Sequence, residues 1–249
     1  MGTIIFDMDG VLVESMPLHY HAMKTAIKEI ANIDLDRREF YLLEGMPIAE
    51  MALEIFKIKG YVDPKNITKK DIRMSVNVAK RKKEVVLETD VIPKPFVGVR
   101  ELITNTLVGC SKAVVSGSSK EEVDIIINET FGTDAFNVII NGDQFEGKGK
   151  PDPASYEVAL QRLNVRPFDA VVVENAPLGV KAANSAGISC IVTLNTSPLA
   201  ISDFKGLISE DHIFTDTSLA RNFLSDWCHS YSKGYLTKLT KSTNNVLDS

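Results

Sequence analysis

Five short runs of apolar residues constrain the fold of this chain more than any other feature. They lie at residues 3–6, 112–116, 137–140, 169–173 and 188–193. None of them alternates cleanly between apolar and polar residues, and near-continuous apolar strands are typical of a parallel sheet that is covered on both faces. Helical patterns follow the later strands, at residues 121–130, 153–163 and 177–186. Strands that alternate with helices predict an α/β fold with a doubly wound parallel sheet, which is a Rossmann-like core.

One long segment interrupts this alternation. Between residues 15 and 92 the sequence shows apolar residues at three- and four-residue spacing and no convincing strand, with helices expected at 18–30, 48–58 and 69–87. Prolines at positions 93 and 95 then indicate a linker back to the sheet. We therefore predict an α/β core made of residues 1–14 and 94–249, and an inserted all-helical domain made of residues 15–93.

Composition excludes several classes of function. The chain has 249 residues and a formal net charge of −5, which disfavours a general nucleic-acid-binding protein. No apolar stretch approaches the roughly 18 residues that a membrane span needs, and the N-terminus does not have the pattern of a signal peptide. Three scattered cysteines predict neither a disulfide framework nor a zinc site, so we expect packing residues and a reducing compartment, the cytoplasm. The tail after Trp227 is expected to be poorly ordered.

Chemically active side chains follow four of the predicted strands. In an open parallel sheet, ligands bind outside the carboxyl ends of the strands. The residues found there are Asp7, Asp9, Ser116, Gly117, Lys150, Glu174 and Asn175.

This combination of residue types favours phosphoryl transfer. Crowded carboxylates repel one another unless a cation lies between them, and oxygen ligands favour a hard cation, which predicts Mg²⁺. Ser116, with the amides that follow it at a glycine-containing helix start, offers donors to an anion, and Lys150 adds a positive charge. Together these groups suit transfer of a phosphoryl group to a carboxylate.

Four ordered motifs resemble those of the haloacid dehalogenase-like hydrolases. They are Asp7-Met8-Asp9-Gly10-Val11, Ser116, Lys150-Pro151 and Glu174-Asn175. The helical insert resembles the small cap domain of the β-phosphoglucomutase-like branch of that family. Four motifs in order on the expected elements are a specific signal, whereas the Asp-x-Asp-Gly pattern alone is a weak one.

The resemblance implies a role for each matching residue. Asp7 corresponds to the nucleophile that forms an aspartyl-phosphate, and Asp9 to the general acid and base. Ser116, Gly117 and Lys150 correspond to the phosphate-binding groups. The magnesium ligands would be Asp7, the backbone carbonyl of Asp9, Glu174 and Asn175. Two further positions in the insert, His19 and Lys82, correspond to a hinge histidine and a substrate-contacting cap residue.

The sequence departs from the family pattern at a few positions. The fourth motif usually has two acids, and here the second is Asn175, whose ligation of metal is left open. The cap arginine and tryptophan of the mutase correspond to Ile48 and Met23, which weakens a phosphosugar mutase interpretation. Dehalogenases and phosphonatases lack the second aspartate, so the presence of Asp9 disfavours both.

The function expected from the sequence is therefore a magnesium-dependent phosphatase of small phosphorylated metabolites. Two alternatives remain: a β-phosphoglucomutase-like mutase, and a weakly catalytic regulatory or binding member of the fold, which Asn175 alone favours. We expect no nucleic-acid or membrane partner, and a monomer or small homo-oligomer.

Overall fold

A computed structural model describes residues 2–89, 91–145 and 147–230 of the chain. In this part of the chain six parallel strands form one sheet in the order β3-β2-β1-β4-β5-β6. The strands are β1 (Thr3–Phe6), β2 (Ser111–Val115), β3 (Val138–Ile140), β4 (Ala170–Glu174), β5 (Ser189–Thr193) and β6 (Ile213–Phe214). The predicted doubly wound parallel sheet is confirmed.

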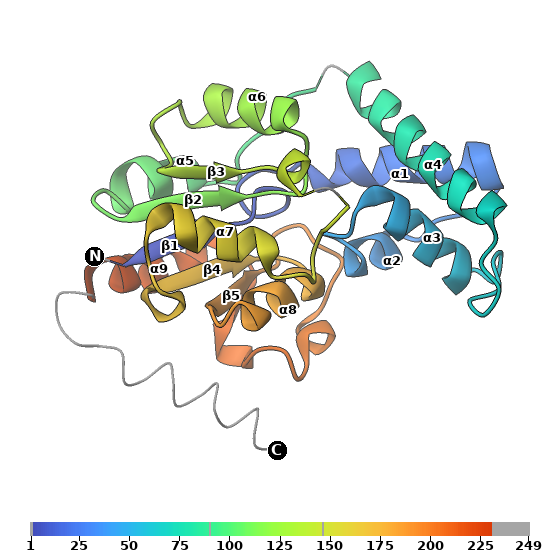
Figure 1. The fold of residues 1–249 in the computed structure, drawn as a ribbon. Coiled ribbons are helices and arrows are strands. Elements are labelled where there is room, and N and C mark those ends of the chain that lie inside the picture. The colour runs from blue at the N-terminus through green and yellow to red at the C-terminus, as the bar shows by residue number, and fades with distance from the viewer. Residues whose placement is uncertain (1, 90, 146, 231–249) are drawn as a thin grey trace.

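Helices cover both faces of this sheet (Figure 1). They are α5 (Val99–Glu101) with the π-helical turn Leu102–Thr106, α6 (Lys120–Thr130), α7 (Ala154–Leu163), α8 (Pro177–Ser185) and α9 (Thr217–Ser230). Successive strand residues point to opposite faces, so Ile4 packs in the cluster that contains α5, α6 and α9, while Ile5 packs with α7 and α8. Burial on both faces explains why the strands are apolar throughout.

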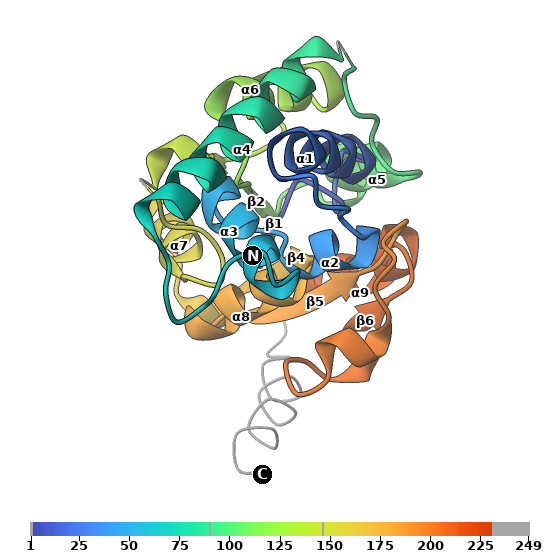
Figure 2. The same cartoon turned by 90° about the vertical axis from the view of Figure 1, so that its right-hand side faces the viewer.

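Four helices occupy the chain between β1 and α5. They are α1 (Met16–Ala31), α2 (Arg37–Leu42), α3 (Ile48–Ile58) and α4 (Lys69–Glu88). Figures 1 and 2 show them as a group beside the sheet, with α4 packed along α1 and α3. The two segments that connect this group to the sheet lie together, since Glu14 N donates to Lys94 O at 2.9 Å. The boundaries of the inserted domain, 15 and 93, stay a prediction.

The structure corrects the expectation that all three cysteines are unpaired packing residues. Cys110 and Cys228 form a disulfide, with their Cα atoms 5.7 Å apart, and only Cys190 is free among the described cysteines. The two partners are 118 residues apart, so no local spacing revealed the pair. They meet because the loop before β2 and the end of α9 pack in the same apolar cluster.

Other local predictions were nearly right. The sequence placed Pro153 inside helix α7, whereas the helix begins one residue later and Asp152 Oδ1 accepts from Ala154 N at 2.9 Å. Strand β6 and helices α2, α5 and α9 were not predicted. Most of the tail after Trp227 lies outside the described residues. In the described part of the chain, no helix is both long and apolar enough to span a membrane.

Candidate active site

The candidate site lies where the strand order reverses, between β1 and β4. The chain winds outward from β1 through β2 to β3, then crosses back to β4 and winds the other way. This switch point opens a crevice at the carboxyl ends of the two central strands. Asp7 follows β1 and Glu174 ends β4, and Asp7 N donates to Val173 O at 3.0 Å, so the strand pairing fixes both acids at this crevice.

Lys150 connects these two acids. Its Nζ donates to Asp7 Oδ1 and, at 2.5 Å, to Glu174 Oε1, and all three side chains are buried. Burial raises the pKa of Asp7 to about 8, with Glu174 and Asp9 adding to the rise and Lys150 opposing it. Burial alone would lower the pKa of Lys150, but the carboxylates of Asp7 and Glu174 hold it well above its usual range.

Glu174 is fully buried and accepts four hydrogen bonds. Its Oε1 accepts from Lys150 and from the Tyr156 hydroxyl at 2.5 Å, and its Oε2 accepts from the backbone amides of Asn175 and Ala176. Gly179 makes room for the carboxylate, since a Cβ there would lie 2.0 Å from it. Glu174 therefore both orders the start of α8 and places a negative charge beside Asp7.

Asp9 has very different surroundings. Four side chains donate to its carboxylate or lie within hydrogen-bond distance of it: Ser15 at 2.5 Å, His19 at 3.2 Å, and Ser116 and Ser118 at 3.0 Å each. Burial alone would raise the pKa of Asp9, but the hydrogen bonds from His19, Ser15 and Ser116 hold it well below its usual value. Asp9 is therefore an oriented carboxylate whose ionised form is favoured.

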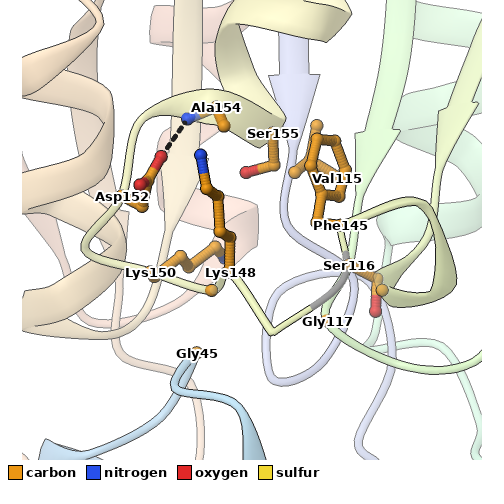
Figure 3. A pocket seen from close by; sticks show the side chains of 12 residues that line it. Gly45, Val115, Ser116, Gly117, Phe145, Lys148, Lys150, Asp152, Ala154 and Ser155 are labelled. Atoms are coloured by element: carbon orange, nitrogen blue, oxygen red, sulfur yellow. Dashed lines mark hydrogen bonds between the residues drawn. The ribbon is translucent and has the colours of Figure 1, made fainter.

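The loop after β2 supplies donors at the same edge. The hydroxyl of Ser116 donates to Asp9 Oδ2. Helix α6 is capped by Ser119, whose side chain accepts from Glu122 N while the Glu122 side chain accepts from Ser119 N. The hydroxyl of Ser116 is thus not used to cap the helix. Gly117 lies beside it with open space at its Cα, and both residues line a small cavity with Lys150 (Figure 3).

Two of the predicted site residues, His19 and Lys82, come from the helical segment, that is, helices α1 to α4 between β1 and α5. Their side chains form a line of contacts that ends at Asp9. Lys82 Nζ lies 3.1 Å from His19 Nδ1, and His19 Nε2 lies 3.2 Å from Asp9 Oδ1. Both side chains are buried, and burial lowers the pKa of Lys82. The structure thus brings His19 and Lys82 to the carboxylate of Asp9.

A cavity of about 250 Å³ opens above the aspartates, between the sheet edge and the helical segment. Asp7, Asp9 and Lys150 form its floor. The wall from the helical segment is largely apolar, with Met16, Met23, Phe40, Met46, Ile48 and Met51. A smaller cavity of about 30 Å³ adjoins it, where Gly45 meets Lys150 and where the exposed Lys148 also lies (Figure 3).

The donor set fits a hard cation. Among the described residues, Asp7 Oδ2 and Asn175 Oδ1 are buried oxygens with no hydrogen-bond partner. Asn175 Oδ1, next in sequence to the Glu174 carboxylate, is the kind of open oxygen that a hard cation binds, while Asp7 Oδ2 is open toward the cavity. In the part of the chain that the structure describes, no three His, Cys, Asp or Glu side chains gather as a metal site. The ligand set expected from the sequence does not require three such side chains, because it includes the amide of Asn175 and the backbone carbonyl of Asp9.

Sequence reasoning missed four residues of this site. Ser15 and Ser118 donate to Asp9, Tyr156 donates to Glu174, and Glu44 accepts from Asn175 Nδ2 at 2.9 and 3.1 Å. Burial and the charge of Asp7 raise the pKa of Glu44 well above its usual range. Only Ser15 and Ser118 carried a local signal, since each lies close in sequence to a predicted site residue.

Known proteins share this sequence pattern. Residues 4–193 match the haloacid dehalogenase-like hydrolase family. The chain is 34% identical over 197 residues to a phosphorylated carbohydrates phosphatase of Thermotoga maritima, covering 77% of this chain and 84% of that protein. It is 27% identical to the β-phosphoglucomutase of Bacillus subtilis, covering 82% of this chain and 88% of that protein.

Solved structures share the fold. A putative β-phosphoglucomutase from Bacteroides vulgatus aligns with a TM-score of 0.76 and 29% identity, covering 94% of this chain and 90% of that one. CbbY from Rhodobacter sphaeroides, solved with xylulose-(1,5)bisphosphate, aligns with a TM-score of 0.62 and 27% identity, covering 79% and 88% of the two chains. The chain therefore belongs to the haloacid dehalogenase-like hydrolases, in the β-phosphoglucomutase-like branch.

Proposed function

We propose that this chain is a magnesium-dependent phosphatase of small phosphorylated metabolites that acts through an aspartyl-phosphate on Asp7. The observation that carries this proposal is the unpartnered Oδ2 of Asp7. That atom is buried at the floor of the cavity, beside Lys150 and two residues from an oriented carboxylate. A carboxylate oxygen without a hydrogen-bond partner, at the base of a substrate-sized cavity, suits a nucleophile.

The proposed reaction has two steps. Asp7 Oδ2 attacks phosphorus while the bond from phosphorus to the ester oxygen breaks. Asp9, which must first take up a proton from solvent, gives that proton to the departing oxygen. Asp9 then takes a proton from the water that attacks the aspartyl-phosphate, which releases phosphate and restores Asp7. Lys150 and the Ser116–Gly117 loop hold the phosphoryl oxygens.

The proposed ligands of the cation are Asp7, the backbone carbonyl of Asp9, Glu174 and Asn175. When bound, Mg²⁺ neutralises the charge that gathers on the phosphoryl group. Glu174 already uses four acceptor positions, so a cation at Glu174 would compete with Lys150 for Oε1. Lys150 would then be free to contact the phosphoryl group.

The lining of the cavity supports a monophosphate over a bisphosphate substrate. The lysines that line the cavity are Lys82, Lys83 and Lys150, while the acids include Glu44, Glu122 and Asp143. Lys82 faces His19 and Lys150 faces Asp7, so the exposed Lys83 is the one lysine of this lining that is left for a second phosphate. The apolar wall at Met23 and Ile48 suits a carbon skeleton instead.

A panel of phosphate esters with Mg²⁺ tests this proposal. The panel contains sugar monophosphates, sugar bisphosphates, phosphoglycolate and nucleotides, with EDTA as the control. We expect magnesium-dependent release of phosphate, faster with monophosphates than with their bisphosphate counterparts. Failure to hydrolyse any ester would contradict the proposal and favour a binding role for the fold.

A mutase is the second candidate, because relatives named β-phosphoglucomutase share the sequence and the fold. It differs only in the acceptor of the phosphoryl group, which is a second hydroxyl and not water. Incubation with glucose 1-phosphate and a bisphosphate primer separates the two activities. A mutase forms the isomer, whereas the proposed phosphatase releases inorganic phosphate.

A further inference from the structure

A carboxylate from the helical segment meets the amide of Asn175. Glu44 lies in the loop between α2 and α3, is half-buried, and lines the same cavity as Asp7 and Lys150. Its two oxygens lie 3.1 and 2.9 Å from Asn175 Nδ2. The two residues are 131 positions apart in the chain, and the reaction proposed above gives Glu44 no role.

This contact fixes which way the amide of Asn175 faces. Asn175 Nδ2 donates to both oxygens of Glu44, so the amide nitrogen faces Glu44 and the amide oxygen faces away from it. Gly10 leaves space for that nitrogen, since a Cβ at Gly10 would lie 2.2 Å from Nδ2, and its φ of +81° suits glycine. Asn175 is 1% exposed, and its other end, Oδ1, has no hydrogen-bond partner.

We propose that Glu44 is a positioning residue for the cation site, which holds Asn175 Nδ2 so that Oδ1 is presented as the ligand atom. This inference rests on the magnesium-dependent function proposed above. A free amide would be ambiguous, because its oxygen and nitrogen have nearly the same shape and only the oxygen binds a cation. Partners that orient a ligand in this way are an established part of how proteins tune metal affinity.

The pairing also gives a reason for the neutral residue at position 175. An aspartate there would place two carboxylates within hydrogen-bond distance of each other, and like charges at that distance repel. Asparagine removes the repulsion and donates to Glu44 instead. The contact thus links the position of the loop between α2 and α3 to the cation site.

Calorimetric titration with Mg²⁺ alone, without substrate, tests the proposal. We expect Glu44→Ala to weaken Mg²⁺ binding by about tenfold or more. Glu44→Gln should retain much of the affinity, because its side-chain carbonyl still accepts from Nδ2. Glu50→Ala is the matched control: it removes an exposed glutamate of α3 and should bind Mg²⁺ as the wild-type chain does.

A double-mutant cycle separates positioning from a simple effect of charge. If Glu44 acts through the amide, Glu44→Ala should have little further effect in an Asn175→Ala background. An equal loss in both backgrounds would overturn the proposal, as would Mg²⁺ binding by Glu44→Ala that matches the wild type. Absence of Mg²⁺ binding by the wild-type chain would overturn the proposed function as well, so the two failures are distinguishable.

Discussion

Asp7 and Asp9 are two residues apart, yet their surroundings are opposite. Asp7 lies among acids, with one oxygen bridged by Lys150 and the other without a partner, and burial raises its pKa to about 8. Asp9 is surrounded by four potential donors that hold its pKa well below the usual value. One carboxyl group is thus left open to a ligand, while the other is oriented and kept ionised.

The segment that follows strand β1 thus supplies two carboxyl groups with different chemical properties. A pair of titratable groups whose environments move their pKa values apart is typical of an acid–base site. The open oxygen of Asp7 suits attack on phosphorus once a cation offsets the neighbouring charges. Because its low pKa keeps Asp9 ionised, Asp9 is ready to take a proton from water in the second step. The first step instead needs Asp9 to carry a proton, so the contact between Asp9 and His19 bears directly on that step.

The largest expected effect comes from Asp7→Asn. An amide cannot form the aspartyl-phosphate, so we expect the rate of phosphate release to fall by about 10³-fold or more. The measurement is steady-state hydrolysis of the best ester from the panel. Asp134→Asn changes an exposed aspartate away from the site and serves as the control. Near-normal turnover by Asp7→Asn would remove the basis for giving the two aspartates different roles.

A smaller loss is expected from Asp9→Asn. Proton transfer by a positioned side chain contributes about 10²- to 10⁴-fold to a rate, and asparagine cannot carry a proton between leaving group and water. Single-turnover kinetics would show whether both steps slow. A rate equal to that of the wild-type chain would exclude Asp9 as the acid and base.

The smallest expected effect is on thermal stability, and its measurement needs no substrate. A carboxyl group whose pKa is raised in the folded state keeps its proton there while the unfolded chain loses it. The raised pKa of Asp7 should therefore make the metal-free protein less stable as pH rises from about 4 to about 8. We expect thermal melting to show this decline in the wild-type chain and a weaker decline in Asp7→Asn. Equal declines would contradict the raised pKa.

The sequence predicted the sheet well because its signals are local. Each of the five apolar runs became a strand, and the helix expected at residues 48–58 has those bounds in the structure. Strand β6 has only two residues, too few to show a pattern. The disulfide between Cys110 and Cys228 was missed because only the packed fold brings the two residues together.

Part of the candidate site was also predictable from local sequence signals, whereas the residues that tertiary packing brings to it were not. Residues that follow strands converge whenever the sheet is parallel, and the structure does bring together Asp7, Asp9, Ser116, Lys150 and Glu174. Their roles stay predictions. Tyr156 and Glu44 were missed because each reaches the site from a helix or loop whose position depends on tertiary packing. No spacing in the sequence relates Glu44 to Asn175.

Trapping the covalent intermediate tests the central claim most directly. The protein is mixed with a phosphate ester and Mg²⁺, quenched in acid within one turnover, digested and examined by mass spectrometry. The account predicts that the peptide containing Asp7 gains the mass of one phosphoryl group, and that Asp7→Asn does not. Turnover with the phosphoryl group on another residue, or with no labelled peptide under conditions that preserve acyl phosphates, would contradict it.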